Sequence, residues 1–270
     1  MKQRNIAILG GGNLGASIAK GLIAAKVHQH SQISVTRRRS HLLEDLKKEG
    51  LEVTRDNLVA VKNAEIVIIS VKPHHILELL EEIKAELTPE KHIVISTVSG
   101  ISIQSITDVI GNIPVYRAMP NTAVAIRESM TCIASNGDNG HLDEIIDFFN
   151  RLGVTKVIAE ELMGAATVVG ACGIAFVLRF MRAMSQGGIE IGFGSEVSQL
   201  ITAQTIKGAS NLILESGNHP EREIDKVTTP RGITISGLNE MEHQGLSSAV
   251  IKGLLSSFNK LEKLSEKNKK

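Results

Sequence analysis

The sequence predicts an α/β fold in which an N-terminal doubly wound sheet is followed by an all-α C-terminal domain. Three observations lead to this prediction. A continuous apolar run, residues 6–9, passes directly into a glycine-rich turn and then into a segment with helical apolar spacing. Short apolar runs alternate with helical patterns up to about residue 160, as in βαβ units. From Met163 onward the apolar residues follow a 3.6-residue period throughout.

The composition sets the outer limits on function. The chain has 270 residues, of which 42% are hydrophobic and 22% charged, with a formal net charge of +1. This balance gives no positive field for a polyanion. Aromatic residues make up 3% and Trp is absent, so platforms for stacking single-stranded bases are scarce. We therefore expect a small-molecule substrate and no nucleic-acid partner.

The cysteines and the start of the chain indicate the compartment. Cys132 and Cys172 stand alone, without a C-x-x-C pair or a metal-ligand spacing, which is typical of a reducing cytoplasm. The nine His are scattered, and the pair His74-His75 is more typical of a surface loop than of a metal site. The first strand begins too early to leave room for a signal peptide. We expect a cytoplasmic protein without a metal.

The turn after the first strand has the spacing G-x-G-x-x-G, formed by Gly10, Gly12 and Gly15. In this motif the first glycine makes a tight turn, the second lets a pyrophosphate approach the backbone, and the third lets helix and strand pack closely. The following helix directs unpaired N–H groups and its positive dipole end toward the phosphate. The motif alone is weak evidence, but the strand before it and the helix after it favour a dinucleotide site. We expect Asn13 and Leu14 to belong to this site as well.

The end of the second strand, residues 33–36, indicates which dinucleotide is bound. At this position an acidic residue binds the ribose 2′-hydroxyl of NAD, whereas an Arg accommodates the 2′-phosphate of NADP. The strand ends at Thr36, and Arg37, Arg38 and Arg39 follow. Because the acid is missing and bases are present, we predict NADP (NADPH), bound through Thr36, Arg37 and Arg38. The alternative is that basic residues at a helix start are simply solvated.

The remaining elements of the first half alternate in the same way. Helix 40–49 stops at Gly50, and Asp56 with Asn57 opens a short helix to residue 62. The later expected elements are strand 66–71, closed by Lys72-Pro73; helix 76–87; strands 93–96 and 113–116; helix 141–152; and strand 155–158. The carboxyl ends of parallel strands lie along one edge, where open α/β sheets bind ligands. We therefore expect the loops 97–100 and 117–122 at that edge.

The second half is organised around residues 164–178, a stretch without charge. The stretch is too short to span a bilayer and is followed by Arg179 and Arg182, so no membrane is expected. A helix that is apolar on nearly every side is buried, and the elements after it, helices 196–216 and 245–264, are too few to bury it. We predict a homo-dimer at least, with a cofactor domain at 1–162 and a helical dimerisation and substrate domain at 163–270.

Four blocks together resemble the signature of the Δ1-pyrroline-5-carboxylate reductase family. They are the glycine turn, Val71-Lys72-Pro73, Arg117-Ala-Met-Pro-Asn-Thr122, and Val227-Thr-Thr-Pro-Arg-Gly-Ile-Thr-Ile-Ser-Gly-Leu238. This family makes proline by reducing a cyclic imine with a nicotinamide cofactor. The resemblance implies a Rossmann-type N-terminal domain, pairing of two subunits through the helical domain, and further assembly of dimers in many members.

The resemblance also implies roles for individual residues. Asn57 would contact the cofactor ribose, and Val71, Lys72 and Pro73 would border the cofactor. Thr234 would face the imine nitrogen as the catalytic residue. With Pro230 as the first helical residue, Gly232, Ile233 and Thr234 would present N–H groups to the substrate carboxylate. The other residues expected at the substrate are Met119, Pro120 and Asn121.

The chain departs from the family pattern at residues 170–176. The usual Ser-Gly-Ser-Gly-Pro-Ala-Tyr stands here as Gly-Ala-Cys-Gly-Ile-Ala-Phe, without two hydroxyls, a kink-forming proline and a phenol. A related imine substrate and a catalytically weak nucleotide-binding paralogue therefore stay open as alternatives. A third alternative, a β-hydroxyacid dehydrogenase, would carry a Lys and an Asn one turn apart in the helix 163–192, which contains no Lys.

Overall fold

The computed structural model describes residues 4–26, 28–137 and 140–268. Contacts divide the chain into two compact units. Unit 1 contains the described residues up to Cys172 together with those from Ser257 onward, and unit 2 is Gly173–Ser256. This division lies beyond the predicted boundary between residues 162 and 163 and returns the end of the last helix to unit 1, where Phe258 packs beside Gly164. The assignment of cofactor and substrate functions to separate domains stays a prediction.

Unit 1 is built on an eight-stranded sheet with the order β3-β2-β1-β4-β5-β6-β7-β8. The chain begins in the interior of the sheet, adds two strands on one side, and then crosses to the other side, which is the predicted doubly wound arrangement. All neighbouring strands are parallel except β6 and β7. The strands are β1 (Ile6–Leu9), β2 (Ile33–Thr36), β3 (Glu52–Thr54), β4 (Ile66–Ile69), β5 (Ile93–Ser96), β6 (Val115–Met119), β7 (Ser129–Ser135) and β8 (Gly153–Val157).

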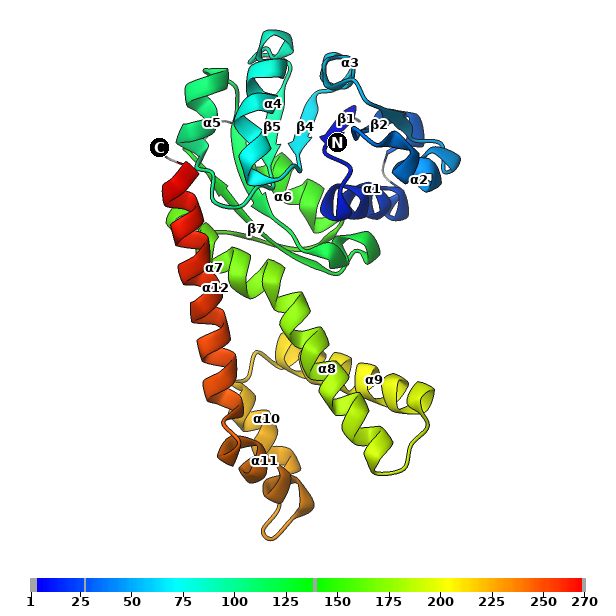
Figure 1. Ribbon diagram of the computed structural model, residues 1–270, viewed down its shortest axis with the longest axis vertical. Helices are drawn as coiled ribbons and strands as arrows, with labels where there is room; N and C mark the ends of the chain where they lie inside the picture. Colours follow the sequence, from blue (N-terminus) through cyan, green and yellow to red (C-terminus); the bar gives the residue numbers. More distant parts are fainter. Residues whose placement is uncertain (1–3, 27, 138–139, 269–270) are drawn as a thin grey trace. The chain divides into compact units, whose positions relative to one another are not determined.

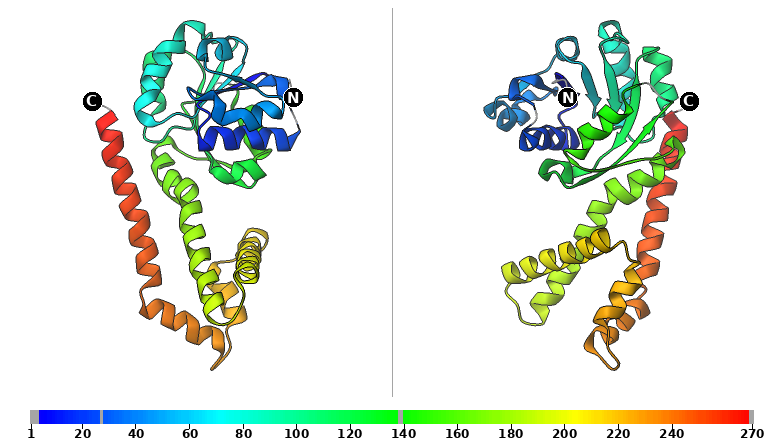
Figure 2. Two further views of the ribbon diagram at one scale, coloured as in Figure 1. Left: turned by 45° about the vertical axis from the view of Figure 1, so that its right-hand side comes forward. Right: turned by 180° about the vertical axis from the view of Figure 1, so that it is seen from behind.

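Helices cover both faces of this sheet (Figure 1, Figure 2). The central strands β1, β2, β4 and β5 are buried at every position, which requires an apolar layer on each side. On one face, Leu22 and Phe149 belong to the same apolar cluster as Ile8, and on the other, Leu80 and Ile106 belong to the cluster of Val67. The helices are α1 (Asn13–Ala25), α2 (Glu44–Lys48), α3 (Asn57–Lys62), α4 (Ile76–Ile83), α5 (Ile103–Ile110) and α6 (Leu142–Asn150).

Strand β7 is absent from the elements predicted from the sequence. Its residues, Ser-Met-Thr-Cys-Ile-Ala-Ser, form no continuous apolar run. The strand exists because it is paired on both sides, antiparallel to β6 and parallel to β8. Tertiary pairing therefore overrides a weak local preference here.

Among the described residues after β8, all regular secondary structure is helical, as predicted. The stretch predicted as one regular helix contains a π-helical segment, Thr167–Cys172, between α7 (Met163–Ala166) and α8. Two further helices, α10 and α11, lie between the helices predicted at 196–216 and 245–264. The elements are α8 (Gly173–Glu190), α9 (Ser195–Ser216), α10 (Pro220–Val227), α11 (Ile233–His243) and α12 (Leu246–Asn268).

In unit 2, α8 and α9 approach closely at a pair of small residues. A Cβ atom on Gly188 would lie 2.2 Å from Ser198 Oγ. That hydroxyl donates a hydrogen bond to the Ser185 carbonyl at 2.7 Å. Along these two helices, large apolar side chains are exposed in the single chain, among them Phe176, Leu178 and Leu200.

The helical stretch Glu160–Glu190 corrects the prediction about membrane-spanning length. Its 31 residues are long and apolar enough to cross a membrane by length and composition alone, although the charge-free part was expected to be too short. The helix is longer than the charge-free stretch because it continues past Arg179 and Arg182. Only 17% of its most apolar window is buried within the single chain, so the described residues leave most of its apolar surface uncovered.

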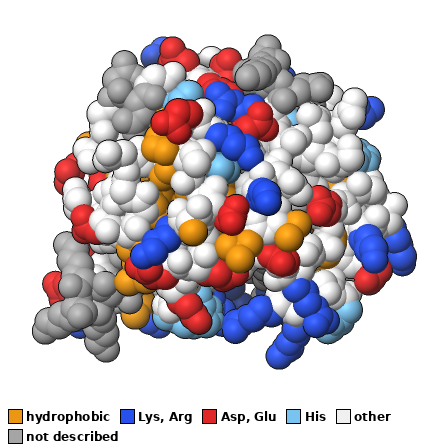
Figure 3. Space-filling view, turned by 90° about the horizontal axis from the view of Figure 1, so that it is seen from above, with side chains coloured by type: hydrophobic (Ala, Val, Ile, Leu, Met, Phe, Trp, Pro, Cys, Tyr) orange, Lys and Arg blue, Asp and Glu red, His pale blue; other side chains and the backbone are white. Residues whose placement is uncertain are grey.

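The surface of the molecule carries mixed charge. On the face shown in Figure 3, acidic and basic side chains alternate with small apolar spots, and neither sign forms a large field. This agrees with the net charge of +1.

Candidate cofactor and substrate site

The glycine turn has the geometry that a dinucleotide phosphate needs. Gly10 has a φ of +107°, and a Cβ there would lie 2.4 Å from the Ser70 carbonyl oxygen. A Cβ on Gly15 would lie 2.2 Å from the Gly10 carbonyl oxygen, so this glycine permits the close packing of helix on turn. A Cβ on Gly12 would meet nothing within 4 Å, which leaves open space in front of the backbone. The cradle therefore fits a pyrophosphate group.

The first turn of α1 completes this cradle. Gly12 is the N-cap, without a side-chain hydrogen bond, and the turn contains no acidic residue. Its N–H groups and positive dipole end thus face the open space in front of Gly12. Asn13 is exposed at the start of the helix, whereas Leu14 packs its side chain against the core. A contact from Leu14 to the cofactor would therefore come from its backbone.

A hydrogen-bonded chain of three side chains occupies the end of β2. The Thr36 hydroxyl donates to Asn57 Oδ1 at 2.6 Å. Asn57 Nδ2 in turn donates to both carboxylate oxygens of Glu82, each at 3.2 Å. The structure therefore brings together the predicted residues Thr36 and Asn57, and it adds Glu82 of α4, which no sequence pattern indicated.

The predicted arginines also lie beside the glycine turn. Arg37 Nη1 donates to the Gly11 carbonyl at 2.9 Å, so this half-buried side chain holds the turn. Arg38 is exposed, and its Nη2 lies 3.3 Å from His75 Nε2. The structure thus separates the two residues: Arg37 has an internal role, whereas Arg38 is accessible to a ligand.

Val71, Lys72 and Pro73 follow β4, next to the glycine turn. A Cβ on Gly10 would lie 2.9 Å from Val71 Cγ1, so the two loops are in contact. Lys72 is exposed and precedes the short 3₁₀ helix Pro73–His75. The ends of β1, β2 and β4 therefore carry the predicted cofactor residues at one edge of the sheet.

Asn121 anchors the loop that follows β6. Its Oδ1 accepts from the Ala123 N–H at 3.0 Å, and its Nδ2 donates to the Gly170 carbonyl at 3.1 Å. The side chain is buried, with 7% of its surface exposed. Gly170 lies in the π-helical segment, and such segments occur often at functional sites. Asn121 therefore ties the predicted substrate segment, in which Met119 is the buried last residue of β6 and Pro120 follows it, to the stretch that departs from the family pattern.

The loop before α11 has a different geometry from the one predicted. The Gly232 N–H donates to the Thr229 carbonyl at 2.8 Å, and Arg231 has a φ of +60°. This is a type II turn with Pro230 at its second position, and α11 begins only at Ile233. The prediction that Pro230 starts the helix and that Gly232 offers a free N–H is therefore wrong.

The turn nevertheless leaves a short row of backbone donors. Gly232 is the N-cap of α11 without a side-chain hydrogen bond, so the N–H groups of Ile233 and Thr234 lack intrahelical acceptors. Thr234 is exposed, and among the described residues its hydroxyl has no hydrogen bond. A hydroxyl and two N–H groups thus point away from the first turn of one helix.

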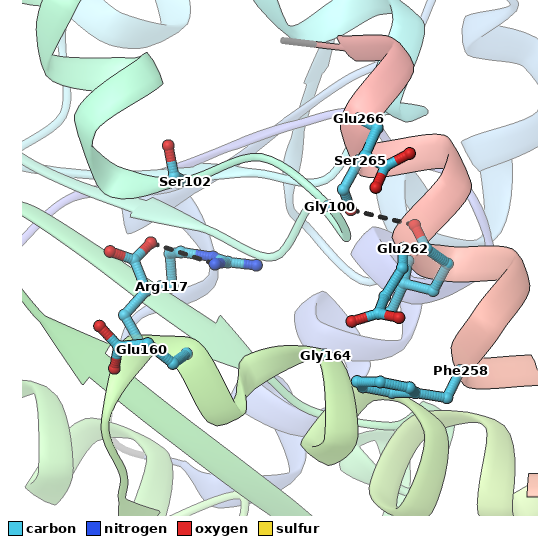
Figure 4. Close-up of a pocket in the computed structure, with 11 residues that line it drawn as sticks. Gly100, Ser102, Arg117, Glu160, Gly164, Phe258, Glu262, Ser265 and Glu266 are labelled. Atoms are coloured by element: carbon cyan, nitrogen blue, oxygen red, sulfur yellow. Dashed lines mark hydrogen bonds and ion pairs between the residues drawn. The ribbon is translucent and has the colours of Figure 1, made fainter. Parts of the chain in front are cut away.

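A cavity of about 480 Å³ lies within unit 1, apart from the predicted site residues. Arg117 enters it from β6, with Nη1 donating to Glu160 Oε1 at 3.1 Å (Figure 4). The lining also includes Glu161, Glu262 and Glu266. Because four carboxylates outnumber one guanidinium, the cavity opposes anions and is not suited to a dinucleotide or a carboxylate substrate.

Cys132 is a poor nucleophile, and the described residues show no metal-binding cluster. Burial raises the pKa of the Cys132 thiol, which keeps it protonated. No group of three or more His, Cys, Asp or Glu within the described residues is arranged to hold a metal ion.

Comparisons with known proteins agree with this geometry. A family model described as "Pyrroline-5-carboxylate reductase dimerisation" matches residues 160–264, and one described as "NADP oxidoreductase coenzyme F420-dependent" matches residues 5–100. Pyrroline-5-carboxylate reductase 2 of Dictyostelium discoideum is 45% identical, over 97% of this chain and 93% of its own length. The chain belongs to the pyrroline-5-carboxylate reductase family.

Two further relatives extend the comparison. Pyrroline-5-carboxylate reductase 1 of the same organism is 48% identical over 97% of this chain, which spans only half of that protein's length. A crystal structure of the pyrroline carboxylate reductase of Plasmodium falciparum with NADP bound has a TM-score of 0.89 at 24% identity and covers 98% of this chain and 99% of its own. At that identity the likeness is one of fold.

Membership of the family confirms several predictions. It confirms the resemblance that the four sequence blocks show. It also confirms the Rossmann-type fold with a helical C-terminal region and the class of NAD(P)-dependent oxidoreductase. NADP as the cofactor class agrees with the match of residues 5–100. The match of residues 160–264 indicates that the chain forms oligomers through this region.

Proposed function

We propose that this chain reduces 1-pyrroline-5-carboxylate to L-proline by hydride transfer from NADPH, the last step of proline biosynthesis. The observation that carries the proposal is the 45% identity to a pyrroline-5-carboxylate reductase over almost the whole of both chains. The glycine turn supports it, because the only glycine of the motif with open space before it is the one that faces the pyrophosphate.

The bound cofactor supplies the hydride, and the chain supplies position and electrostatics. In the proposal, the N–H groups at the start of α1 and the open space at Gly12 hold the pyrophosphate. Thr36 and Asn57 hold the adenosine ribose, and Arg38 reaches the 2′-phosphate, while Arg37 keeps the glycine turn in shape through the Gly11 carbonyl. The predicted residues Val71, Lys72 and Pro73 border the cofactor.

The first turn of α11 provides the groups for the imine acid. We assign the N–H groups of Ile233 and Thr234 to the substrate carboxylate, since they have no intrahelical acceptor and lie at a positive dipole end. The Thr234 hydroxyl hydrogen-bonds the ring nitrogen as the C=N bond becomes a C–N bond. Gly232 shapes the turn, because a Cβ there would lie 2.5 Å from Thr229 Oγ1. Asn121 orders the loop that follows Met119 and Pro120.

The proposal includes the assembly and the location. We assign the cofactor function to residues 1–162 and the substrate and dimerisation functions to residues 163–270. The protein acts as a homo-dimer at least, in which a second copy covers the exposed apolar side chains of α8 and α9. Further assembly of dimers, and a cytoplasmic location without a nucleic-acid or membrane partner, complete the proposal.

A single assay tests the reaction. NADPH absorbance at fixed enzyme concentration should fall on addition of pyrroline-5-carboxylate, with L-proline formed in equal amount. With NADP⁺ in place of NADPH as the hydride acceptor, oxidation of a 3-hydroxyacid without imine reduction would identify a β-hydroxyacid dehydrogenase. Turnover of other cyclic imines alone would identify a related imine reductase. Intact NADPH binding without any turnover would identify the weak paralogue to which the altered residues 170–176 point.

A further inference from the structure

The carboxylate of Glu82 lies two hydrogen bonds from the end of β2, a position at which the sequence has no acidic residue. At the end of β2, a dehydrogenase that uses NAD carries an acidic residue for the ribose 2′-hydroxyl. This chain has Thr36 there, but the hydrogen bonds from Thr36 to Asn57 and from Asn57 to Glu82 connect that position to a carboxylate on α4. Glu82 lies 46 positions beyond Thr36 in the sequence, so only the fold brings them together.

We infer that Glu82 is a specificity-determining residue that sets the balance between NADPH and NADH. The inference rests on the proposed function for the identity of the cofactor. Glu82 acts in two ways: it orients the Asn57 amide, and it places a negative charge two hydrogen bonds from the end of β2.

The orientation follows from hydrogen-bond chemistry. An ionised carboxylate only accepts hydrogen bonds, so it selects the rotamer of Asn57 in which Nδ2 faces Glu82. Asn57 Oδ1 then faces the Thr36 hydroxyl, which donates to it. The second hydrogen of Nδ2 stays available for a ribose oxygen. Without an acceptor oxygen at this position, the amide is free to rotate.

The charge acts differently on the two cofactors. The 2′-phosphate of NADPH carries negative charge, which the Glu82 carboxylate repels, whereas the 2′-hydroxyl of NADH is neutral. Arg38 opposes this repulsion, since its guanidinium lies on the loop that follows Thr36 and is exposed. The cofactor preference is therefore the difference between an attractive Arg38 and a repulsive Glu82.

The experiment compares NADPH and NADH affinities by fluorescence titration of the full-length wild-type protein, Glu82→Gln and Glu81→Gln. Gln keeps the size of the side chain and a hydrogen-bonding oxygen while it removes the charge. Glu82→Gln should bind NADPH about 3- to 10-fold more tightly, with NADH affinity changed by less than about twofold. The gain should vanish at about 1 M salt, where the screening length falls to about 3 Å.

Glu81→Gln is the matched control. Glu81 is the neighbouring residue on α4, but its carboxylate pairs with Lys84. Its replacement should leave the ratio of the two affinities unchanged. An unchanged ratio in Glu82→Gln, an equal shift in Glu81→Gln, or a gain that persists at high salt would overturn the inference. The titration contains no imine, so its result stands apart from the outcome of the turnover assay.

Discussion

The two units of this chain differ in how they bury apolar surface. In unit 1, both faces of the sheet are covered, and the largest buried side chains, such as Tyr116, Phe149 and Ile68, are less than 2% exposed. In unit 2, the buried residues within the described chain are Ser198 and Thr202, both polar and both at the approach of α9 to α8. Helices α8, α10 and α11 have none.

The difference indicates that the two units are stabilised in different ways. Unit 1 has a core of its own, because strands with apolar residues on both faces are enclosed by two helical layers. Unit 2 leaves Leu200 and Leu214 at least 70% exposed, and exposed apolar surface of this kind marks an interaction site. Each Å² that a second copy covers contributes about 25 cal/mol. Unit 1 is thus expected to be stable by itself, and unit 2 only in the assembly.

The largest effect should come from a charge in the apolar surface of α8. Leu178→Asp would bury an unpaired carboxylate in the assembly, which costs about 3–5 kcal/mol and should abolish oligomers. Light scattering after gel filtration measures the mass. The matched control is Leu42→Asp in unit 1, where an apolar side chain of similar exposure should tolerate the charge. An oligomeric Leu178→Asp protein would contradict the comparison.

A substitution that leaves a cavity in the core of unit 1 should have a nearly equal effect. This effect should be on the stability of unit 1 and should not depend on assembly. Phe149→Ala should lower the free energy of unfolding by about 3–5 kcal/mol, since the side chain is fully buried between α6 and the sheet. Chemical denaturation followed at two protein concentrations should give the same loss at both. A loss that depends on concentration would mean that unit 1 also relies on the assembly.

The next effect concerns catalysis in unit 2. Thr234→Val keeps the shape of the side chain and removes its hydroxyl, so kcat/KM for pyrroline-5-carboxylate should fall about 10- to 100-fold, or about 1.4–2.7 kcal/mol. NADPH affinity should change by less than about twofold, because the cofactor residues lie in unit 1. A matching fall in NADPH affinity would place Thr234 at the cofactor instead.

A smaller effect separates the two arginines of unit 1. Arg38→Ala should weaken NADPH binding by about 1–1.5 kcal/mol and leave NADH binding unchanged, since an exposed charge-assisted hydrogen bond is lost. Arg37→Ala should weaken both cofactors alike, because Arg37 holds the Gly11 carbonyl. Equal losses for both cofactors in Arg38→Ala would show that this arginine is also structural.

The smallest expected effect is a pH dependence confined to unit 1. Burial lowers the pKa of His92, whose Nδ1 accepts the Thr88 N–H at 2.9 Å and therefore carries no proton. The unfolded chain then binds a proton more readily, so stability is full above about pH 6.5 and falls as the pH drops below it. Urea midpoints at pH 7.5 and 5.5 should converge in His92→Gln. If the dependence of stability on pH is the same in His92→Gln as in the wild type, the loss of stability at low pH would be due to His28, whose pKa is also lowered by burial.

The sequence by itself determined the elements whose signals are local. The apolar run 6–9, the three glycines and the helical period predicted β1, its turn and α1, because backbone sterics and side-chain alternation act over a few residues. The four family blocks were sufficient for the enzyme class. The apolar stretch 164–178 was sufficient for the prediction of an oligomer.

The tertiary structure alone decided the features that depend on distant neighbours. β7 is a strand because β6 and β8 pair with it, and residues 167–172 form a π-helix with Asn121 bound to the Gly170 carbonyl. Glu82 reaches Asn57 because α3 and α4 lie side by side in the fold. No local pattern records such contacts, since hydrogen bonds and packing between remote residues depend on where the chain returns in space.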